Sequence, residues 1–209
     1  MLFLDELGEF SLDVLESLRL PLEEGTVRVA RALHRVSFPA RFLLVAAMNP
    51  CPCGEGLQPG RCRCGDGALL RYSRRLSGPL LDRFDLRIEV HPPDPEMLLR
   101  GEGGESTGAI AERVQRVRQV AATRGVTSNA LLDLKQLDEF APLSAEASTY
   151  LEKSMRAGLL SARGLRRVRS VALTLHDLRE VPVPIDLRAV SMALQLRGEP
   201  RFLSRRMAS

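Results

Sequence analysis

Two short apolar runs, each followed at once by polar residues, constrain the fold of this chain more than any other feature. The first is Met1–Leu4, which ends in Asp5 and Glu6, and the second is Phe42–Met48, which ends in Asn49. A run that is apolar at every position is typical of a central strand in a parallel sheet with helices on both faces. We therefore expect an α/β sheet whose strands end in polar residues, at the edge where such sheets bind ligands. The alternative is that the two acids only enter a turn or cap the next helix.

The residues between the two runs predict a helix and a hairpin. Leucines recur at helical spacing over 11–22, and Pro21 is expected to mark the end of that helix. Valines then alternate with arginines over 26–38, which predicts a β-hairpin with one basic face. The basic residues of this hairpin are Arg28, Arg31, His34 and Arg35.

The rest of the chain predicts a loop, a linker and a helical part. Residues 50–67 are dense in Gly and Pro and are expected to form a loop, and 77–90 are expected to form a helical turn that leads into a strand. Residues 101–108 are expected to be a linker. The α/β part is thus placed at 1–100 and an all-α part at 109–209. Helical spacing recurs in the second part over 110–121, 145–155, 165–178 and 187–196.

The basic residues are nearly all arginine, since only Lys135 and Lys153 are lysines and the net charge is +4. Arginine suits bidentate contacts with phosphate, but a GC-rich genome explains the same composition equally well. Arginines cluster over 61–75 and over 163–169, which makes these stretches candidate phosphate-facing patches or, alternatively, solvated surface. No apolar run approaches 18 residues and no signal-peptide pattern is present, so a cytoplasmic protein without a membrane partner is expected.

The four cysteines follow the pattern C-x-C-x₈-C-x-C within the expected loop. Four thiolates in a Gly-rich loop can bind tetrahedral Zn²⁺, and in a reducing compartment a structural zinc is favoured over two disulfides. Free or redox-active thiols remain open as an alternative. The candidate ligands are Cys51, Cys53, Cys62 and Cys64.

Several motifs together resemble a known family. LFLDELGEF, PARFLLVAAMNPCPCG, SGPLLDRFDL and SARGLRRVRSVALTLHDL are similar to the magnesium-chelatase-like AAA+ ATPases, in the ComM/YifB competence-protein branch. The resemblance covers nearly the whole chain. It implies a partial AAA+ P-loop NTPase core with a parallel sheet, followed by a C-terminal helical lid bundle.

The resemblance also implies roles for the residues at the strand ends. Asp5 and Glu6 match the Walker B pair, so Asp5 is expected to hold Mg²⁺ through a water and Glu6 to orient and polarise the attacking water. Asn49 matches sensor 1 and is expected to contact the γ-phosphate of ATP or the same water. The expected cofactors are therefore ATP and Mg²⁺.

Two arginines acquire roles from the same resemblance. Arg83 matches the arginine finger that reaches the nucleotide of a neighbouring subunit, and Arg163 matches the sensor 2 arginine at the start of a lid helix. A guanidinium suits both tasks because it spreads positive charge over phosphoryl oxygens in a fixed fork. Without the resemblance, Arg83 reads as a helix-terminal ion pair with Asp82 or Asp85.

The resemblance further implies a DNA motor. The hairpin falls where related helicases line a central pore, so its basic residues are expected to track a DNA backbone without reading sequence. An exposed sheet edge kept soluble by arginines is the alternative. The implied assembly is a homo-hexamer that couples ATP hydrolysis to branch migration of single-stranded or branched DNA in recombination of transforming DNA.

Two departures from the family qualify these expectations. No G-x-x-x-x-G-K-[ST] phosphate loop is present in the chain, so Met1 is expected to match an interior position of a longer protein and independent ATP hydrolysis is not expected. Leu173 also stands where the branch usually has an arginine. A magnesium-chelatase subunit, and a non-catalytic module that binds DNA or full-length partners, remain rival readings.

Overall fold

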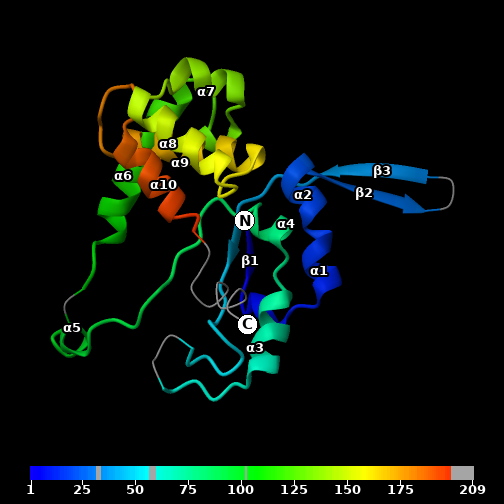
Figure 1. The fold of residues 1–209 in the computed structure, drawn as a ribbon. Coiled ribbons are helices and arrows are strands. Elements are labelled where there is room, and N and C mark those ends of the chain that lie inside the picture. The colour runs from blue at the N-terminus through cyan, green and yellow to red at the C-terminus, as the bar shows by residue number, and fades with distance from the viewer. Residues whose placement is uncertain (32–33, 57–59, 102, 199–209) are drawn as a thin grey trace. The chain divides into compact units, whose positions relative to one another are not determined.

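The computed structural model describes residues 1–31, 34–56, 60–101 and 103–198 (Figure 1). They form two compact units, residues 1–84 and residues 85–198. The division falls before the linker expected over 101–108, because residues 85–90 are bonded to the second unit. Arg167 pairs with Asp85 at 2.7 Å, and the Arg87 N–H donates to the Leu196 carbonyl at 2.6 Å.

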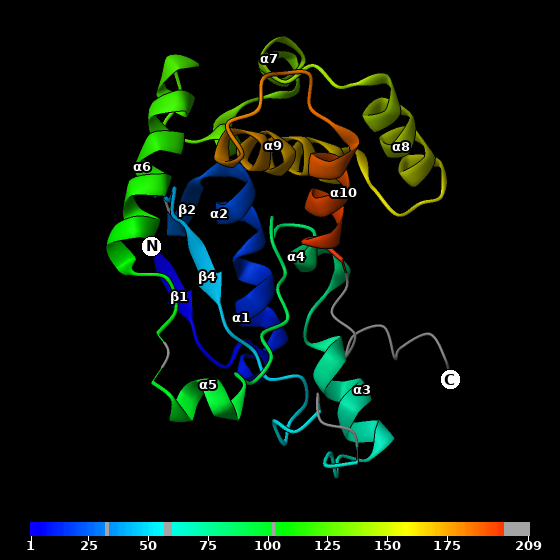
Figure 2. The ribbon, with the colours of Figure 1, turned by 90° about the vertical axis from the view of Figure 1, so that its left-hand side faces the viewer.

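A small parallel sheet lies at the centre of the first unit. β1 (Leu2–Leu4) pairs with β4 (Leu44–Ala46), with Leu4 opposite Ala46. The two apolar runs of the sequence are therefore neighbouring parallel strands, as predicted. Figure 2 shows the two strands side by side.

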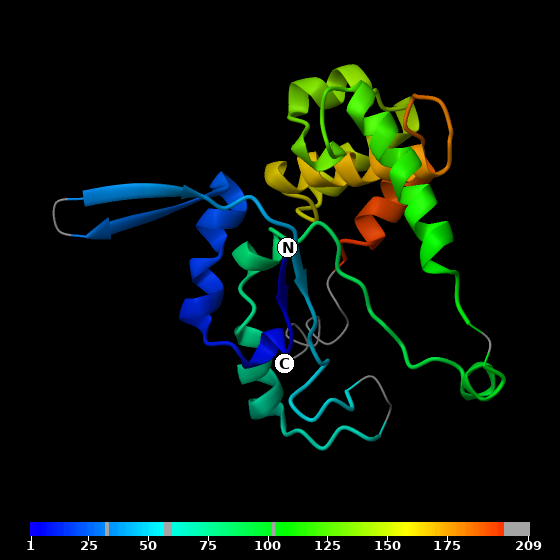
Figure 3. The ribbon, with the colours of Figure 1, turned by 180° about the vertical axis from the view of Figure 1, so that it is seen from behind.

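Helices cover one face of this sheet. α1 (Leu12–Ser17), α2 (Arg19–Glu24) and α4 (Gly78–Leu81) lie on the same side of β1 in Figures 1 and 3. Leu15 of α1 and Leu80 and Leu81 of α4 form the core of the unit together with Leu7 and Leu76. Leu4, Ala46 and Met48 pack against this core from the sheet side. On the other face, Phe3 is 55% and Val45 39% exposed. The prediction of helices on both faces is thus not met by the described helices of the first unit.

The expected helix over 11–22 is two short helices. The Ser11 hydroxyl accepts from the Val14 N–H and begins α1, as its position predicts. The first helix ends at Ser17, Leu18 caps both helices, and α2 then contains Pro21 at its third position. The prediction that Pro21 ends the helix is wrong, because in the first turn the missing N–H of proline has no intrahelical acceptor to lose.

The predicted hairpin is present. β2 (Thr26–Arg31) and β3 (His34–Pro39) are antiparallel and project away from α2 (Figures 1 and 3). In the first unit, a 3-10 turn (Leu7–Glu9) follows β1 and α3 (Asp66–Arg74) follows the cysteine loop.

The second unit is helical. Its elements are α5 (Pro95–Leu99), α6 (Thr107–Thr123), a 3-10 turn (Asn129–Leu131), α7 (Leu134–Phe140), α8 (Ala145–Arg156), α9 (Ala162–Leu178) and α10 (Leu187–Gln195). The strand expected within 86–90 is absent from this described stretch, which is neither helix nor strand. The core is built around α9, where Leu173 is fully buried, so an arginine at this position would bring its charge into the core.

Candidate functional site

The turn after β1 presents two exposed carboxylates. The Asp5 Oδ1 atom accepts from the Glu6 N–H at 2.9 Å, and Glu6 adopts the left-handed conformation with φ 49° and ψ 47°. The Leu7 N–H donates to the Ala47 carbonyl at 2.9 Å, and the Ala47 N–H donates to that of Leu4 at 2.9 Å. These bonds fix the turn to the end of the neighbouring strand.

Asn49 leaves the sheet from the same edge. Because β1 and β4 are parallel and Leu4 lies opposite Ala46, both chains emerge at the carboxyl end of the pair. Asn49 is exposed, and its backbone carbonyl accepts from the Tyr72 hydroxyl at 2.9 Å. The structure therefore brings Asp5, Glu6 and Asn49 to one edge of the sheet with polar side chains accessible to solvent.

Arg83 is buried within its own unit. Its residue is 8% exposed, its Nε donates to the Arg19 carbonyl at 3.0 Å, its Nη1 donates to that of Pro79, and its Nη2 pairs with the Glu23 carboxylate. The ion pair is thus with Glu23, while Asp85 pairs with Arg167. The arginine-finger assignment stays a prediction, and in this conformation all three guanidinium nitrogens serve the fold.

Arg163 lies in the helical unit, exposed on the first turn of α9 behind the N-cap Ser161. Two of its neighbours in the arginine cluster donate to backbone carbonyls of the same unit. The Arg166 guanidinium donates to the carbonyls of Ala130 and Leu132, and buried Arg169 donates to those of Leu137 and Ala141. The cluster over 163–169 is therefore not one phosphate-facing patch, because several of its arginines hold the helices together.

The hairpin has two different faces. The register places Arg28 opposite Ser37 and Arg35 opposite Ala30, so Arg28 and Arg35 share a face. Arg28 pairs with Glu24 at 2.8 Å. Arg31 lies opposite His34 on the alternate register positions, so the prediction of one basic face that carries all four residues is wrong. The side chains of Arg31 and His34 lie outside the described residues. The face opposite Arg28 is exposed and apolar, and consists of Val27, Val29, Val36 and Phe38.

The four cysteines gather at one point. All four Sγ atoms lie within 4.8 Å of one another, with Cys51–Cys53 at 3.3 Å, Cys53–Cys62 at 3.8 Å and Cys62–Cys51 at 3.7 Å. Four sulfurs around a tetrahedral Zn²⁺ at about 2.3 Å are about 3.8 Å apart, so this arrangement fits zinc. The sulfurs are too far apart for disulfides, and the cysteines are free.

The protein environment shifts the pKa values of Cys51 and Cys53 in opposite directions. Burial raises the pKa of Cys51 to about 12, and the hydrogen bond between the Cys51 and Cys53 thiols adds to this shift. Backbone N–H groups of Glu55 and Arg63 lower the pKa of Cys53 to about 6. Cys53 is thus the thiol best prepared to act as a thiolate ligand at neutral pH.

Two residues at the inner face of α3 were missed by sequence reasoning. Tyr72 is buried, and Arg75, one turn further, donates to the Gly8 carbonyl and pairs with Glu9 at 3.2 Å. Burial, followed by the negative charge of Glu9, raises the pKa of Tyr72 to about 12. The signal in the sequence is the spacing of a tyrosine and an arginine on one helical face directly after the last cysteine.

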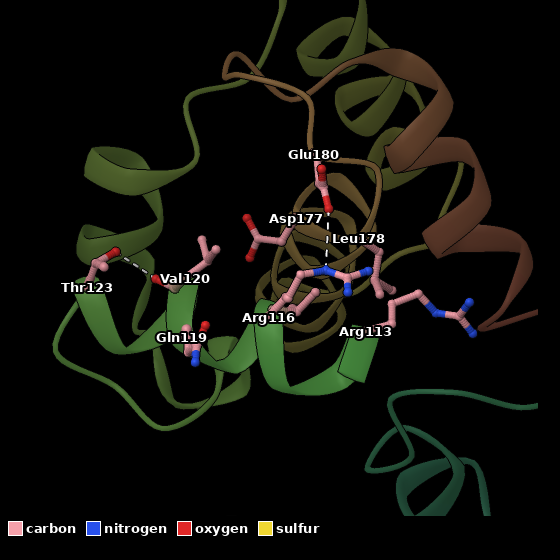
Figure 4. Close-up of a pocket in the computed structure, with 9 residues that line it drawn as sticks. Arg113, Arg116, Gln119, Val120, Thr123, Asp177, Leu178 and Glu180 are labelled. Carbon is pink, nitrogen blue, oxygen red and sulfur yellow. Dashed lines mark hydrogen bonds and ion pairs between the residues drawn. The ribbon is translucent and has the colours of Figure 1, made fainter. Parts of the chain in front are cut away.

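A pocket of about 450 Å³ lies in the helical unit between α6 and the end of α9 (Figure 4). Arg116 Nε lies 3.6 Å from the Glu180 carboxylate, and Asp177 is engaged by Arg124 at 2.6 Å. The pocket contains none of the predicted site residues.

Among the described residues, no helix combines the length and apolar character needed to cross a membrane.

Comparison with known proteins identifies the family. The family model described as magnesium chelatase, subunit ChlI, matches residues 1–117, and that of its C-terminal part matches 104–197. The chain is 42% identical over 86% of its length to "Competence protein ComM" of Haemophilus influenzae, and 38% identical over 97% to "Uncharacterized protein YifB" of Escherichia coli. An uncharacterised protein of Mycobacterium tuberculosis is 42% identical over 96% of the chain.

The chain spans 35% of the ComM protein, 40% of YifB and 41% of the mycobacterial relative. Both family models together account for residues 1–197, in agreement with the resemblance inferred from the motifs. The chain belongs to the magnesium chelatase subunit ChlI family, in the ComM/YifB branch.

Proposed function

We propose that this chain supplies part of the nucleotide site of a ComM-like AAA+ ATPase, in which ATP hydrolysis is coupled to branch migration of DNA. The observation that carries the proposal is the common edge at which Asp5, Glu6 and Asn49 leave two parallel strands. Ligands of open α/β sheets bind at this edge. Family membership supports a nucleotide and Mg²⁺ as the ligands.

The exposed side chains suit the roles that the resemblance implies. Asp5 is an oxygen donor of the kind that Mg²⁺ prefers, and would hold the ion through water. Glu6 would orient and polarise the attacking water, and Asn49 would contact the γ-phosphate or the same water. Bound Mg²⁺ neutralises charge on the phosphates, so the protein contributes positioning and electrostatic stabilisation.

Two arginines would complete the nucleotide site, Arg163 as sensor 2 and Arg83 as the finger that reaches the nucleotide of a neighbouring subunit. Arg163 is exposed on the first turn of α9 and would contact phosphate as sensor 2. Arg83 would act as the finger only after its guanidinium exchanges the Glu23 carboxylate for phosphoryl oxygens of a neighbouring subunit. Such an exchange would link the conformation of α2 to nucleotide contact across an interface.

DNA is the proposed polymeric partner, and a homo-hexamer the proposed assembly. Arg28 and Arg35 share one face of a projecting hairpin, which supports contact with a phosphate backbone. Arg31 and His34 belong to the same proposal. Zn²⁺ bound by the four cysteines is proposed as a structural ion that orders the loop after Asn49.

The rival from the chelatase family remains. The matching family models carry the name of a magnesium chelatase subunit, which favours insertion of Mg²⁺ into a porphyrin. The ComM and YifB relatives, similar over most of the chain, favour the DNA motor. A non-catalytic module is a third reading, because the chain carries no phosphate-loop motif of its own.

The deciding experiment measures Mg-ATP binding and hydrolysis by the 209-residue chain and by a longer homologous protein that includes a phosphate loop, with and without branched DNA. We expect the chain alone to be inactive and the longer protein to show DNA-stimulated turnover. Glu6→Gln in the longer protein should retain ATP binding and abolish turnover. Unchanged turnover in Glu6→Gln would remove its assigned role, and stimulation by porphyrin in place of DNA would favour the chelatase reading.

A mixing experiment tests the finger. Arg83→Ala subunits mixed with wild-type subunits of the longer protein should lower activity by more than their share, because the arginine would act on a neighbour's nucleotide. Strictly additive activity would contradict the assignment.

A further inference from the structure

The inner face of α3 contacts both strand ends of the candidate site. Tyr72 is 6% exposed, and its hydroxyl donates to the Asn49 carbonyl at 2.9 Å. The side of its ring lies against Gly8, where a Cβ atom would stand 2.4 Å from the Tyr72 Cζ. A single side chain thus touches the backbone on which Asn49 is carried and the turn that follows Asp5 and Glu6.

Arg75 reinforces the same contact one turn along the helix. Its Nη1 donates to the Gly8 carbonyl and lies 3.2 Å from the Glu9 carboxylate. Tyr72 and Arg75 are neighbours on one face of α3, as residues three apart in a helix are. The helix therefore contacts the turn after β1 in two ways. The Tyr72 ring packs against Gly8, and the Arg75 guanidinium binds the Gly8 carbonyl and the Glu9 carboxylate.

The chain path connects these contacts to the cysteines. Cys51 follows Asn49 by two positions, and Cys64 precedes the start of α3 at Asp66 by two. The loop between Asn49 and α3 thus begins and ends in the cysteine cluster. The hydrogen bond from Tyr72 of α3 to the Asn49 carbonyl connects the two ends of this loop directly. A metal ion held by the four thiols would fix both ends of this loop, and so remove most of the freedom that α3 would otherwise have relative to the strands.

From these contacts we infer that Tyr72 and Arg75 are positioning residues, which make the geometry of the Asp5–Glu6 turn and of Asn49 depend on metal binding by the four cysteines. The inference rests on the proposed function, because it adds a metal-dependent control to the same nucleotide site. Loss or oxidation of the thiols would loosen α3 and, with it, the strand ends.

Amide hydrogen exchange of the 209-residue chain tests the inference without any measurement of ATPase activity. Zn²⁺ at one equivalent is compared with the metal-free chain, and exchange is followed in peptides that cover residues 2–10 and 43–50. The N–H groups of Leu7 and Ala47 report on the site directly, because both are bonded across the strand ends. We expect Zn²⁺ to slow exchange at least about fivefold in residues 2–10, which lie outside the cysteine loop; this is the effect of about 1 kcal/mol.

Two variants and a control assign the effect to the contacts. Tyr72→Phe keeps the ring and deletes the hydroxyl, and Arg75→Gln removes the guanidinium. Arg74→Gln is the matched control, because Arg74 is exposed on the same helix. We expect both test variants to bind Zn²⁺ with unchanged stoichiometry while most of the protection of residues 2–10 is lost, and Arg74→Gln to behave as wild type.

The outcomes separate the inference from its premises. Protection confined to the loop over 50–64 in the wild type, or full protection of residues 2–10 in both variants, would overturn the coupling. Failure of the chain to bind one Zn²⁺ with its four thiols would overturn it at the first step. If the coupling holds while the longer protein shows no ATP turnover, the proposed function fails and the metal-dependent positioning stands.

Discussion

At the scale of single residues, Glu6 is held in a backbone conformation that side chains disfavour. Its φ of 49° lies in the left-handed region, where residues other than glycine cost about 1–2 kcal/mol. The bonds from Leu7 to Ala47 and from Glu9 to Glu6 maintain this turn. Strain of this kind is typical of sites where a side chain must be aimed.

Substitution of Glu6 measures the strain. We expect Glu6→Gly to be more stable than Glu6→Ala by about 1 kcal/mol, because only glycine adopts this conformation without a Cβ penalty. Urea unfolding of the chain gives the difference directly. Equal stability of the two variants would show that the left-handed turn is not maintained in solution.

Arg83 permits a second test, because a guanidinium that is bound within the fold cannot at the same time reach the nucleotide of a neighbouring subunit. As part of the fold it should contribute to stability, and we expect Arg83→Gln to lower the free energy of unfolding by about 2–3 kcal/mol, since it leaves the Glu23 carboxylate and buried carbonyls without their donor. Urea unfolding measures the loss, with Arg74→Gln as the exposed control. A loss below about 0.5 kcal/mol would favour a guanidinium that is already free to reach a neighbouring subunit.

At the scale of elements, the start of α10 gives a pH-dependent contribution. The Arg179 guanidinium, followed by the Ala189 N–H, lowers the pKa of the N-cap Asp186. A carboxyl whose pKa is lower in the folded state stabilises the fold above its unfolded pKa of about 3.9, and loses this contribution as the pH falls through the folded pKa. Asp186→Asn keeps an N-cap acceptor and removes the charge.

We therefore expect the melting temperature of the wild type to exceed that of Asp186→Asn at pH 6, and the difference to shrink as the pH falls below about 4. Thermal unfolding of both variants from about pH 6 to about pH 3 measures the change. The Arg179→Gln variant should show the same narrowing against wild type. A difference that is constant over this range would exclude the Arg179–Asp186 pair as its cause.

Some helices and strands could be predicted from the sequence and others could not. The parallel pair of β1 and β4 and the β2–β3 hairpin follow from local apolar patterns, and both are confirmed. The break at Leu18 and the absence of a strand over 86–90 could not be predicted from local patterns. The Arg19 carbonyl beside the break accepts from Arg83, the Arg87 N–H donates to the Leu196 carbonyl, and both partners are distant in sequence. Tyr72 was missed for the same reason, since its partners Gly8 and Asn49 are far away in sequence.

At the scale of the whole chain, the main feature is the sheet of the first unit, which has one apolar face that the helices of that unit leave uncovered. Both runs are apolar at every position, yet Phe3 and Val45 are exposed and neither strand has a second partner among the described residues. Parallel sheets of this kind are stable when both faces are covered. The ComM and YifB relatives are more than twice as long as the stretch that this chain matches.

The uncovered face predicts how the 209-residue chain behaves in solution. An exposed apolar surface beside open strand edges favours pairing between copies, so we expect the mean mass in sedimentation to rise with protein concentration. The double variant Phe3→Ser/Val45→Thr should reduce this rise while its unfolding free energy changes by less than about 1 kcal/mol, because both side chains are already solvated. Val90→Thr, at a 79% exposed position of the other unit, is the control and should leave the association unchanged. If Val90→Thr reduced the association as much as the double variant does, the association would not involve the sheet face. A large loss of stability in the double variant would mean that the sheet face is covered within the chain itself.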